Sequence, residues 1–315
     1  MSDVITLHDS TTGATARIAP QRGFNCFSYQ PVVDGQPFEV LWTAEDFVAG
    51  GGKGSHSGIP ILFPFPGRLR GTHFEFQGRT FALVAGDGIG NAIHGFVIDR
   101  PWRVVEQTGT MAVAEFQAAK DGPELLAHWP ADFRIAVAYE LVGHALTSEV
   151  RIENTGDGTL PFGFGTHPYF RVPLGTDGSA DNCVVNVPAS SYWELKDMLP
   201  SGRKFPATGT RGLSLGMRFV ETHLDDVFTD LTYAAGRALT TITDPTNHRT
   251  LEMSFDEQCR ECVVYNPPHR QAICIEPYTC VPDAYALAEH DIETGLRVLN
   301  PGETFSTRID IRLRG

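Results

Sequence analysis

The sequence contains few features of membrane, secreted or nucleic-acid-binding proteins. No apolar run among its 315 residues is long enough to cross a bilayer, and residues 1–6 lack the basic and apolar regions of a secretory signal. Positive charge is also scarce, because 25 Lys and Arg face 38 Asp and Glu, giving a net charge of −13. No run rich in Lys and Arg offsets this acidity. We therefore expect a cytoplasmic protein that binds neither nucleic acid nor membrane.

Cysteine is rare as well. Six cysteines in a chain of this length are too few and too scattered for a disulfide framework. Cys259 and Cys262 have the spacing of a redox or zinc pair, but no second pair accompanies them. They lie beside the apolar residues 263–265, and we interpret them as thiols packed in a strand.

Three glycine-rich segments lack the spacing of the motifs that they resemble. Residues 49–55 do not match a phosphate-binding loop, and residues 86–90 are one residue short of a dinucleotide-binding fingerprint. In residues 54–58, His56 stands where a nucleophilic serine would be. No histidine pair has the spacing of zinc-protease ligands. We expect loops at these places and neither a metal nor another cofactor.

The dominant pattern in the chain is a period-two alternation of apolar and polar residues. Three long runs, residues 133–141, 146–153 and 305–313, each place apolar side chains on one face, as half-buried antiparallel strands do. Shorter candidate strands are residues 81–84, 103–106, 112–117, 238–243, 251–255 and 272–275.

Helical periodicity is nearly absent. One short helix is expected over residues 283–288, and 32 Gly and 21 Pro separate the strands. No repeat or linker divides the chain. The pattern predicts a single all-β domain over residues 1–315, a large sandwich or barrel with few short helices.

Two polar residues in otherwise apolar or glycine-rich segments suggest ligand contacts. Arg68 follows the proline-stiffened segment 58–67, and its guanidinium could grip sugar hydroxyls or a carboxylate. His94 lies between Ile93 and Gly95 and could bind a ligand hydroxyl. A surface role for Arg68 and a structural role for His94 stay equally open.

Two further polar residues in apolar surroundings suggest proton transfer. His167 is surrounded by the glycines and aromatic residues of segment 161–170, which suits a sugar face beside a proton donor, although a core histidine fits as well. Glu276 ends an apolar strand before Pro277, so we expect it to be partly buried. A buried carboxyl group has a raised pKa, which suits a general base near neutrality.

These segments occur in an order and with a spacing that resemble the aldose 1-epimerase (galactose mutarotase-like) family over nearly the full chain. The motifs are an Arg after F-P, then H-G, H-x-Y-F, D-x-x-F/Y and E-P. They read here as residues 65–68, 94–95, 167–170, 225–228 and 276–277. The resemblance implies a β-supersandwich with the site on its concave face.

The resemblance also implies residue roles. Glu276 is expected to be the general base and His167 the general acid, while Arg68, His94 and Asp225 are expected to contact the sugar. Asp226 is adjacent, but the position of Phe228 favours Asp225.

The family pattern is incomplete at two places, and both concern the substrate. Gly67 stands where the family usually has Asn before the Arg. Tyr278 and Thr279, which follow the E-P motif, differ from the usual galactose-type residues.

The function implied is exchange of the α and β anomers of a hexose without a cofactor. A base removes the C1 hydroxyl proton and an acid protonates the ring oxygen, one from each side of the substrate. The partner is then a small sugar, and the protein a monomer or homodimer.

Three alternatives remain. A phosphosugar epimerase, such as one acting on glucose 6-phosphate, could use Lys53, Arg68 and Arg70 around the phosphate. A non-catalytic carbohydrate-binding protein could share the fold. A glycoside hydrolase could pair Glu276 with Asp225, but His167 would then have no role.

Overall fold

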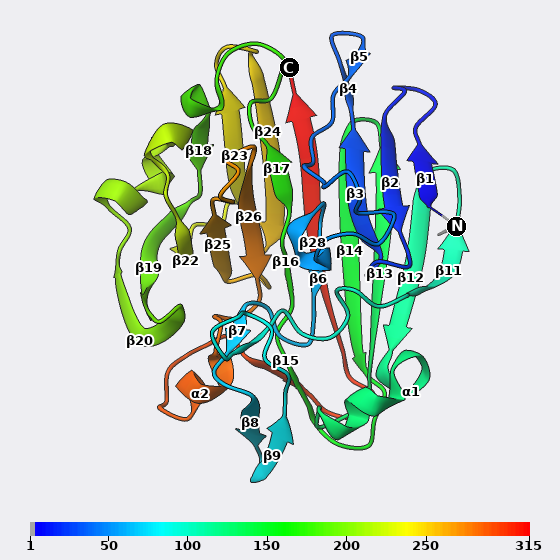
Figure 1. Ribbon diagram of the computed structural model, residues 1–315, viewed down its shortest axis with the longest axis vertical. Helices are drawn as coiled ribbons and strands as arrows, with labels where there is room; N and C mark the ends of the chain where they lie inside the picture. Colours follow the sequence, from blue (N-terminus) through cyan, green and yellow to red (C-terminus); the bar gives the residue numbers. More distant parts are fainter. Residues whose placement is uncertain (1–3) are drawn as a thin grey trace.

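Antiparallel strands dominate the computed structural model, which describes residues 4–315 (Figure 1). Within this range there are two short α-helices, α1 (Ala118–Asp121) and α2 (Ala284–Ala288), besides short segments of 3-10 helix. Helix α2 lies where the sequence predicts one. The all-β prediction is confirmed, and the single-domain organisation stays a prediction.

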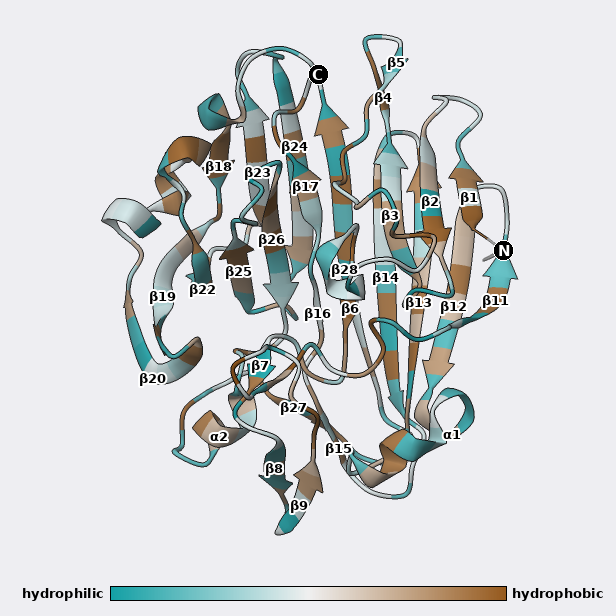
Figure 2. Cartoon of the chain, viewed as in Figure 1, coloured by the Kyte–Doolittle hydropathy of each residue, from teal (hydrophilic) through white to brown (hydrophobic). Residues whose placement is uncertain are grey.

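The larger of the two main sheets has nine strands and contains the three long alternating runs as β13, β14 and β28. Its strand order is β11 (Arg103–Gln107), β12 (Met111–Gln117), β13 (Phe133–Val142), β14 (Ala145–Asn154), β28 (Thr304–Arg314), β24 (Arg249–Asp256), β23 (Arg237–Asp244), β18 (Val184–Asn186) and β21 (Met217–Arg218). Alternation of teal and brown along these strands is visible in Figure 2. Along β13 every second residue from Phe133 to Leu141 is buried, as the sequence predicts.

The second main sheet has eight strands and carries the residues of interest. Its order is β20 (Leu199–Pro206), β19 (Ala189–Lys196), β22 (Asp225–Leu231), β25 (Glu261–Tyr265), β26 (Ala272–Tyr278), β16 (Gly165–Thr166) and β6 (Ile61–Leu62), and β17 (Tyr169–Arg171) also pairs with β26. Every residue of β26 is buried. Burial on both faces hides the period-two pattern in this strand.

Smaller sheets complete the fold. One has three strands, β1 (Ile5–His8), β2 (Thr15–Ala19) and β3 (Asn25–Gln30), and the others are the pairs β4 (Val32–Val33) with β5 (Gln36–Pro37), β7 (Arg68–Leu69) with β10 (Ala92–Ile93), β8 (His73–Phe76) with β9 (Arg79–Ala82), and β15 (Leu160–Phe162) with β27 (Arg297–Leu299). The strand expected over residues 81–84 is therefore β9, two residues earlier.

The core lies between the two main sheets. Ile135 of β13, Met253 of β24 and Ile275 of β26 belong to one buried cluster. Ile273 joins the same cluster, whereas Cys274 and Tyr278 pack in separate clusters on the other side of β26. Even-numbered side chains of β26 therefore face away from the main core.

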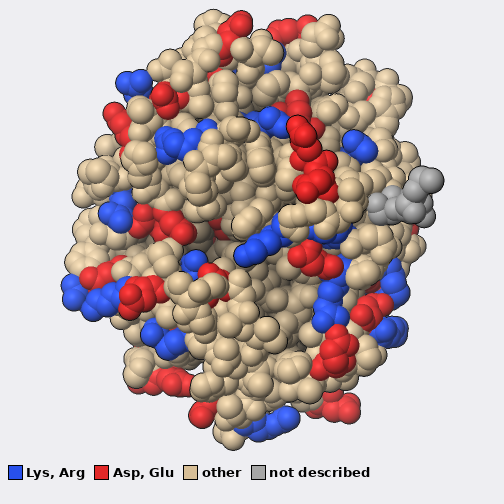
Figure 3. Space-filling model, viewed as in Figure 1, with Lys and Arg blue, Asp and Glu red and all other residues tan. Residues whose placement is uncertain are grey.

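Cys262 lies in β25 as the sequence predicts, whereas Cys259 lies in the connection between β24 and β25 and not in a strand. All six cysteines are free and buried, including Cys259 and Cys262. Residues 4–315 contain no helix long and apolar enough to span a membrane. On the face shown in Figure 3, acidic and basic side chains are interspersed and no continuous basic area forms.

Candidate active site

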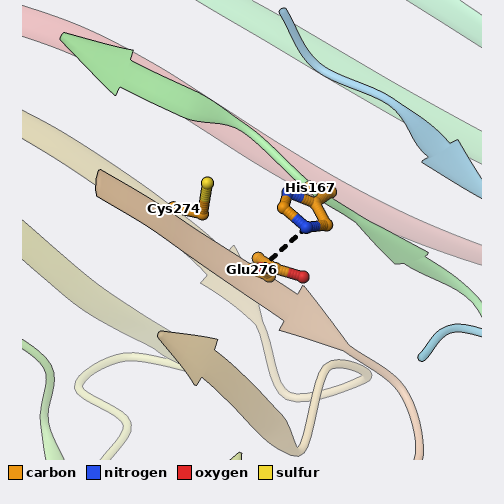
Figure 4. Close-up of side chains that lie close together, drawn as sticks. All are labelled: His167, Cys274 and Glu276. Atoms are coloured by element: carbon orange, nitrogen blue, oxygen red, sulfur yellow. Dashed lines mark ion pairs between the residues drawn. The ribbon is translucent and has the colours of Figure 1, made fainter. Parts of the chain in front are cut away.

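The strand register brings His167 and Glu276 together. Gly165 pairs with Tyr278 and Tyr169 pairs with Cys274 across β26, so His167 lies opposite Glu276. Directly opposite residues have neighbouring side chains in an antiparallel pair. His167 Nε2 is accordingly 3.2 Å from Glu276 Oε1 (Figure 4).

This geometry corrects two expectations. Pairing with β25 continues through Pro277, so Glu276 lies inside β26 and does not end the strand. The acid and base were expected on opposite sides of the substrate, but the register places His167 and Glu276 in direct contact. Both side chains therefore line the cavity side by side.

Glu276 is held by a hydrogen bond on its second oxygen. Tyr278 Oη donates to Glu276 Oε2 at 2.5 Å. Residues two apart on a strand project from the same face, which explains why Tyr278 reaches Glu276. Oε1 has no hydrogen-bond partner of good geometry within residues 4–315 and is the oxygen nearest to His167 Nε2.

Burial opposes charge on both members of the pair. Burial raises the pKa of Glu276 well above its ordinary value, although the Tyr278 hydroxyl and the Arg68 charge act in the opposite direction. Burial also lowers the pKa of His167 to about 3. Both shifts favour the uncharged forms, and because the two groups are in contact the pair titrates as a unit.

Aromatic rings fix the orientation of His167. Its imidazole stacks on Tyr169 with ring centroids 4.8 Å apart and an interplanar angle of 10°. Tyr265 meets it edge-on at 6.1 Å. The backbone N–H of His167 donates to the Pro60 carbonyl at 3.0 Å. These contacts, rather than a polar partner on buried Nδ1, hold the ring.

Arg68 and His94 come from two neighbouring short strands. Arg68 lies in β7 opposite Ile93 of β10, and His94 follows directly with a φ of 64°. The next residue must be glycine, because a Cβ on Gly95 would stand 2.1 Å from the Phe63 carbonyl oxygen. This tight turn directs the His94 ring to within 5.5 Å of the His167 ring, centroid to centroid.

Burial, followed by the charges of His167, Arg68 and His56, lowers the pKa of His94 well below its ordinary value. The ring is thus neutral at physiological pH. A neutral imidazole can both donate and accept hydrogen bonds, as contact with a sugar hydroxyl requires.

Adjacent aspartates at the start of β22 face opposite ways. Asp226 is buried and its Oδ1 accepts a hydrogen bond from Arg211 Nε at 2.8 Å. Asp225 is exposed and lines the cavity, and partial desolvation raises its pKa. Asp225, and not Asp226, is therefore among the residues that line the cavity.

The five residues selected from the sequence line one cavity of about 160 Å³. This volume is well above the roughly 10–15 Å³ that one water needs on the same measure, so the cavity has room for a small ligand. Further lining residues are His56, Tyr169, Tyr265 and Tyr278 on the polar side, and Ile93, Leu195, Met198, Val227 and Val263 as apolar surface.

Sequence reasoning misses several of these lining residues. Leu195 and Met198 come from the β19–β20 hairpin and carry no polar or motif signal. Tyr278 was noticeable only as a departure from the family pattern. Its proximity to Glu276 could have indicated contact, because both project from one face of a strand.

Other charged residues near Arg68 in the sequence lie outside the cavity. Arg70 forms a salt bridge to Asp283 with Nη2 and Oδ2 3.0 Å apart, and neither Arg70 nor Lys53 lines the cavity. Among the lining residues described, Arg68 is the one Lys or Arg. Lys53, Arg68 and Arg70 therefore do not form the cluster of cations that a phosphosugar site would need.

One group of side chains has the composition of a metal-ligand set. Ligand atoms of His167, Cys274 and Glu276 all lie within 4.8 Å of one another (Figure 4). Burial, together with nearby Glu276 and Asp225, raises the pKa of Cys274 well above its ordinary value. Metals bind the thiolate, so this environment disfavours metal ligation by Cys274.

Comparisons with known proteins agree with the motifs. A family model described as aldose 1-epimerase matches residues 3–312. The uncharacterized protein YihR of Escherichia coli K12 is 25% identical over 231 residues, which cover 71% of this chain and 70% of YihR.

Solved structures show the same fold. A galactose mutarotase-like protein from Clostridium acetobutylicum superimposes with a TM-score of 0.85 at 23% identity, covering 96% of this chain and 93% of that one. A galactose 1-epimerase from Lactobacillus acidophilus superimposes with a TM-score of 0.76 at 17% identity, covering 99% and 94%. The predicted galactose mutarotase-like sandwich is confirmed.

Proposed function

The chain belongs to the aldose 1-epimerase family, and we propose that it interconverts the α and β anomers of a free hexose. The observation that carries this proposal is the buried contact between His167 Nε2 and Glu276 Oε1 at 3.2 Å. Such a pair holds a proton that it can exchange with a ligand. Arg68, His94 and Asp225 on the same cavity wall supply contacts for sugar hydroxyls.

The proton transfers balance over the whole cycle. Starting with the shared proton on His167, the Glu276 carboxylate removes the C1 hydroxyl proton while His167 protonates the ring oxygen. The C1–O bond of the ring breaks and the aldehyde forms. After rotation about C1–C2, the reverse transfers close the ring on the other face and restore both groups. Acid–base catalysis of this kind contributes about 10²–10⁴-fold.

The proximity of acid and base suits the substrate. The C1 hydroxyl oxygen and the ring oxygen are both bonded to C1, so one group for each must approach from nearly the same place. Side chains in mutual contact meet that requirement better than side chains on opposite walls. Tyr278 holds Glu276 Oε2, which leaves Oε1 for the sugar.

The charges favour an unphosphorylated sugar. Arg68 already pairs with Asp87, with Nε and Oδ2 3.1 Å apart. Asp225 adds a carboxyl group to the wall, burial disfavours charge on Glu276 and His167, and no second Lys or Arg is among the described lining residues. Among these residues a phosphate would therefore meet no unpaired positive charge. The apolar surface from Leu195 and Met198 suits the C–H face of a sugar ring.

A catalytic role is also favoured over binding alone. Glu276 is 1% exposed and His167 is 6% exposed. Burying ionisable groups is costly, and a binding protein could contact hydroxyls with neutral amides. A cytoplasmic location, which rests on the composition, and a monomeric or homodimeric state also belong to the proposal.

Saturation-transfer NMR of anomer exchange over a panel of free and phosphorylated sugars tests the function. We expect faster exchange for at least one free hexose and weaker effects on its 6-phosphate. Exchange at the uncatalysed rate for every sugar, together with measurable sugar binding, would instead indicate a carbohydrate-binding protein. Selective action on the phosphosugars would contradict the charge argument.

A further inference from the structure

The glycine-rich loop over residues 86–91 binds its own carboxylate. Asp87 Oδ1 accepts hydrogen bonds from the backbone N–H groups of Ile89 at 3.0 Å and Asn91 at 2.9 Å. Oδ2 accepts from Asn91 Nδ2 at 2.9 Å and from Arg68 Nε at 3.1 Å. Gly88 and Gly90, with φ of 81° and 104°, allow the chain to curl around this group.

The loop keeps Asp87 charged. The Asp87 side chain is 0% exposed. Burial alone would raise the pKa of Asp87, but the hydrogen bonds from Asn91, Ile89 and Arg68 outweigh it and lower the pKa to about 2. A fixed negative charge therefore stands behind Arg68 at every pH at which an enzyme works.

Arg68 has two other carboxyl groups within electrostatic reach. Its charge acts on both Asp225 and Glu276 across the cavity wall. In the described part of the chain, however, Arg68 forms a salt bridge with Asp87 alone. In a cavity of low dielectric, Arg68 without Asp87 would be free to pair with Asp225 or with Glu276 instead. An ion pair with Glu276 would occupy the oxygen that the proposed reaction needs.

We propose that Asp87 is a positioning residue, which holds Arg68 away from Glu276 and directs its remaining guanidinium nitrogens at the sugar. The inference rests on the proposed function. It also gives a role to the loop that resembles a dinucleotide fingerprint in the sequence: the backbone N–H groups bind a side-chain carboxylate of the same loop and no phosphate.

Hydrogen bonds hold the loop that carries Asp87 rigidly enough for this role. The backbone N–H of Gly86 donates to the Asn91 carbonyl at 2.9 Å, and that of Ala92 donates to Gly71 at 2.9 Å. Asn91 Oδ1 accepts from the Gly71 N–H at 3.0 Å. The loop is thus tied to the segment that carries Arg68, so Asp87 and Arg68 keep their relative position.

Asp87→Asn tests the proposal, because it removes the charge at nearly constant size. The assay uses the free hexose that the wild-type protein exchanges fastest. We expect kcat/KM to fall about 10- to 100-fold, with a clear rise in KM, since a misplacement of about 1 Å can cost that much. In an Arg68→Ala background the same change should have no further effect, because its target is gone.

Asp283→Asn is the matched control. Asp283 accepts hydrogen bonds from the backbone N–H of Arg70 at 2.9 Å and from Arg70 Nε at 3.2 Å. This pair resembles Asp87 with Arg68 but lies outside the cavity, so the variant should change kcat/KM less than twofold. Asp283 has a φ of 58°, which Asn tolerates.

The outcomes separate the two proposals. If the wild-type protein exchanges no sugar, the proposed function and this inference both fall. If it does, and Asp87→Asn behaves like wild type or adds its full effect to Arg68→Ala, the positioning role is refuted and the function stands. Should Asp87→Asn not fold, Asp87→Ser replaces it with the same expectations, because its hydroxyl still accepts hydrogen bonds from the loop.

Discussion

Replacing Tyr278 by Phe perturbs the base without removing it. Tyr278 is 1% exposed, and its hydroxyl donates to Glu276 Oε2 at 2.5 Å. Phenylalanine keeps the ring in its packing position and deletes this one donor. The carboxylate of Glu276 is then less stabilised, while the protonated form is hardly affected.

The magnitude follows from the strength of the bond. A hydrogen bond to a charged group contributes about 1.5–3 kcal/mol, and about 1.36 kcal/mol corresponds to a tenfold change. Loss of the donor raises the pKa of Glu276 further, so the acid limb of the rate profile moves to higher pH. Below that limb we expect exchange to be about 10- to 100-fold slower than wild type.

The pH profile of kcat/KM for anomer exchange, followed by NMR, measures the effect. Tyr285→Phe is the control, because the Tyr285 hydroxyl is buried without a hydrogen-bond partner in residues 4–315 and lies outside the cavity. It should leave the profile unchanged. An acid limb at the same pH in wild type and Tyr278→Phe would refute the reasoning that Tyr278 stabilises the basic form of Glu276.

Three further predictions follow from the cavity. Arg68→Ala and His94→Ala should each weaken sugar binding as well as turnover, which a binding isotherm beside the exchange assay detects; unchanged affinity would remove these residues from the ligand contacts. Gly67→Asn should destabilise the fold by about 1–3 kcal/mol, measured by thermal unfolding, because a Cβ at Gly67 would stand 2.7 Å from Pro282 Cγ. Chelator treatment should leave exchange unaltered, and a stoichiometric metal bound through His167 or Glu276 would contradict the proposed mechanism.

Much of the fold is predictable because a half-buried strand alternates apolar and polar residues along its sequence. Strand β13 shows this, with buried residues at alternate positions from Phe133 to Leu141. Strand β26 is predicted only to residue 275, because burial on both faces removes the alternation and Pro277 suggests an end. Two-residue strands such as β7 and β16 are too short for any periodicity and form only through their partners.

The site is predictable in its members but not in its geometry. Polar residues in apolar surroundings and their order along the chain indicate Arg68, His167 and Glu276. Contact between the last two depends on the register of β16 and β17 against β26, which no local pattern specifies. Leu195 and Met198 reach the cavity through a hairpin from the far end of the sheet, and their sequence carries no sign of it.

The most direct test of the central claim is the exchange rate of Glu276→Gln, measured beside its sugar affinity. Glutamine keeps the shape of Glu276 and its hydrogen bonds but cannot accept the C1 proton. We predict exchange slower by about 10²–10⁴-fold with far smaller changes in affinity. His167→Asn should behave similarly, and the double variant should lose much less than the product of the two. Wild-type exchange by Glu276→Gln would contradict the mechanism and favour a carbohydrate-binding protein.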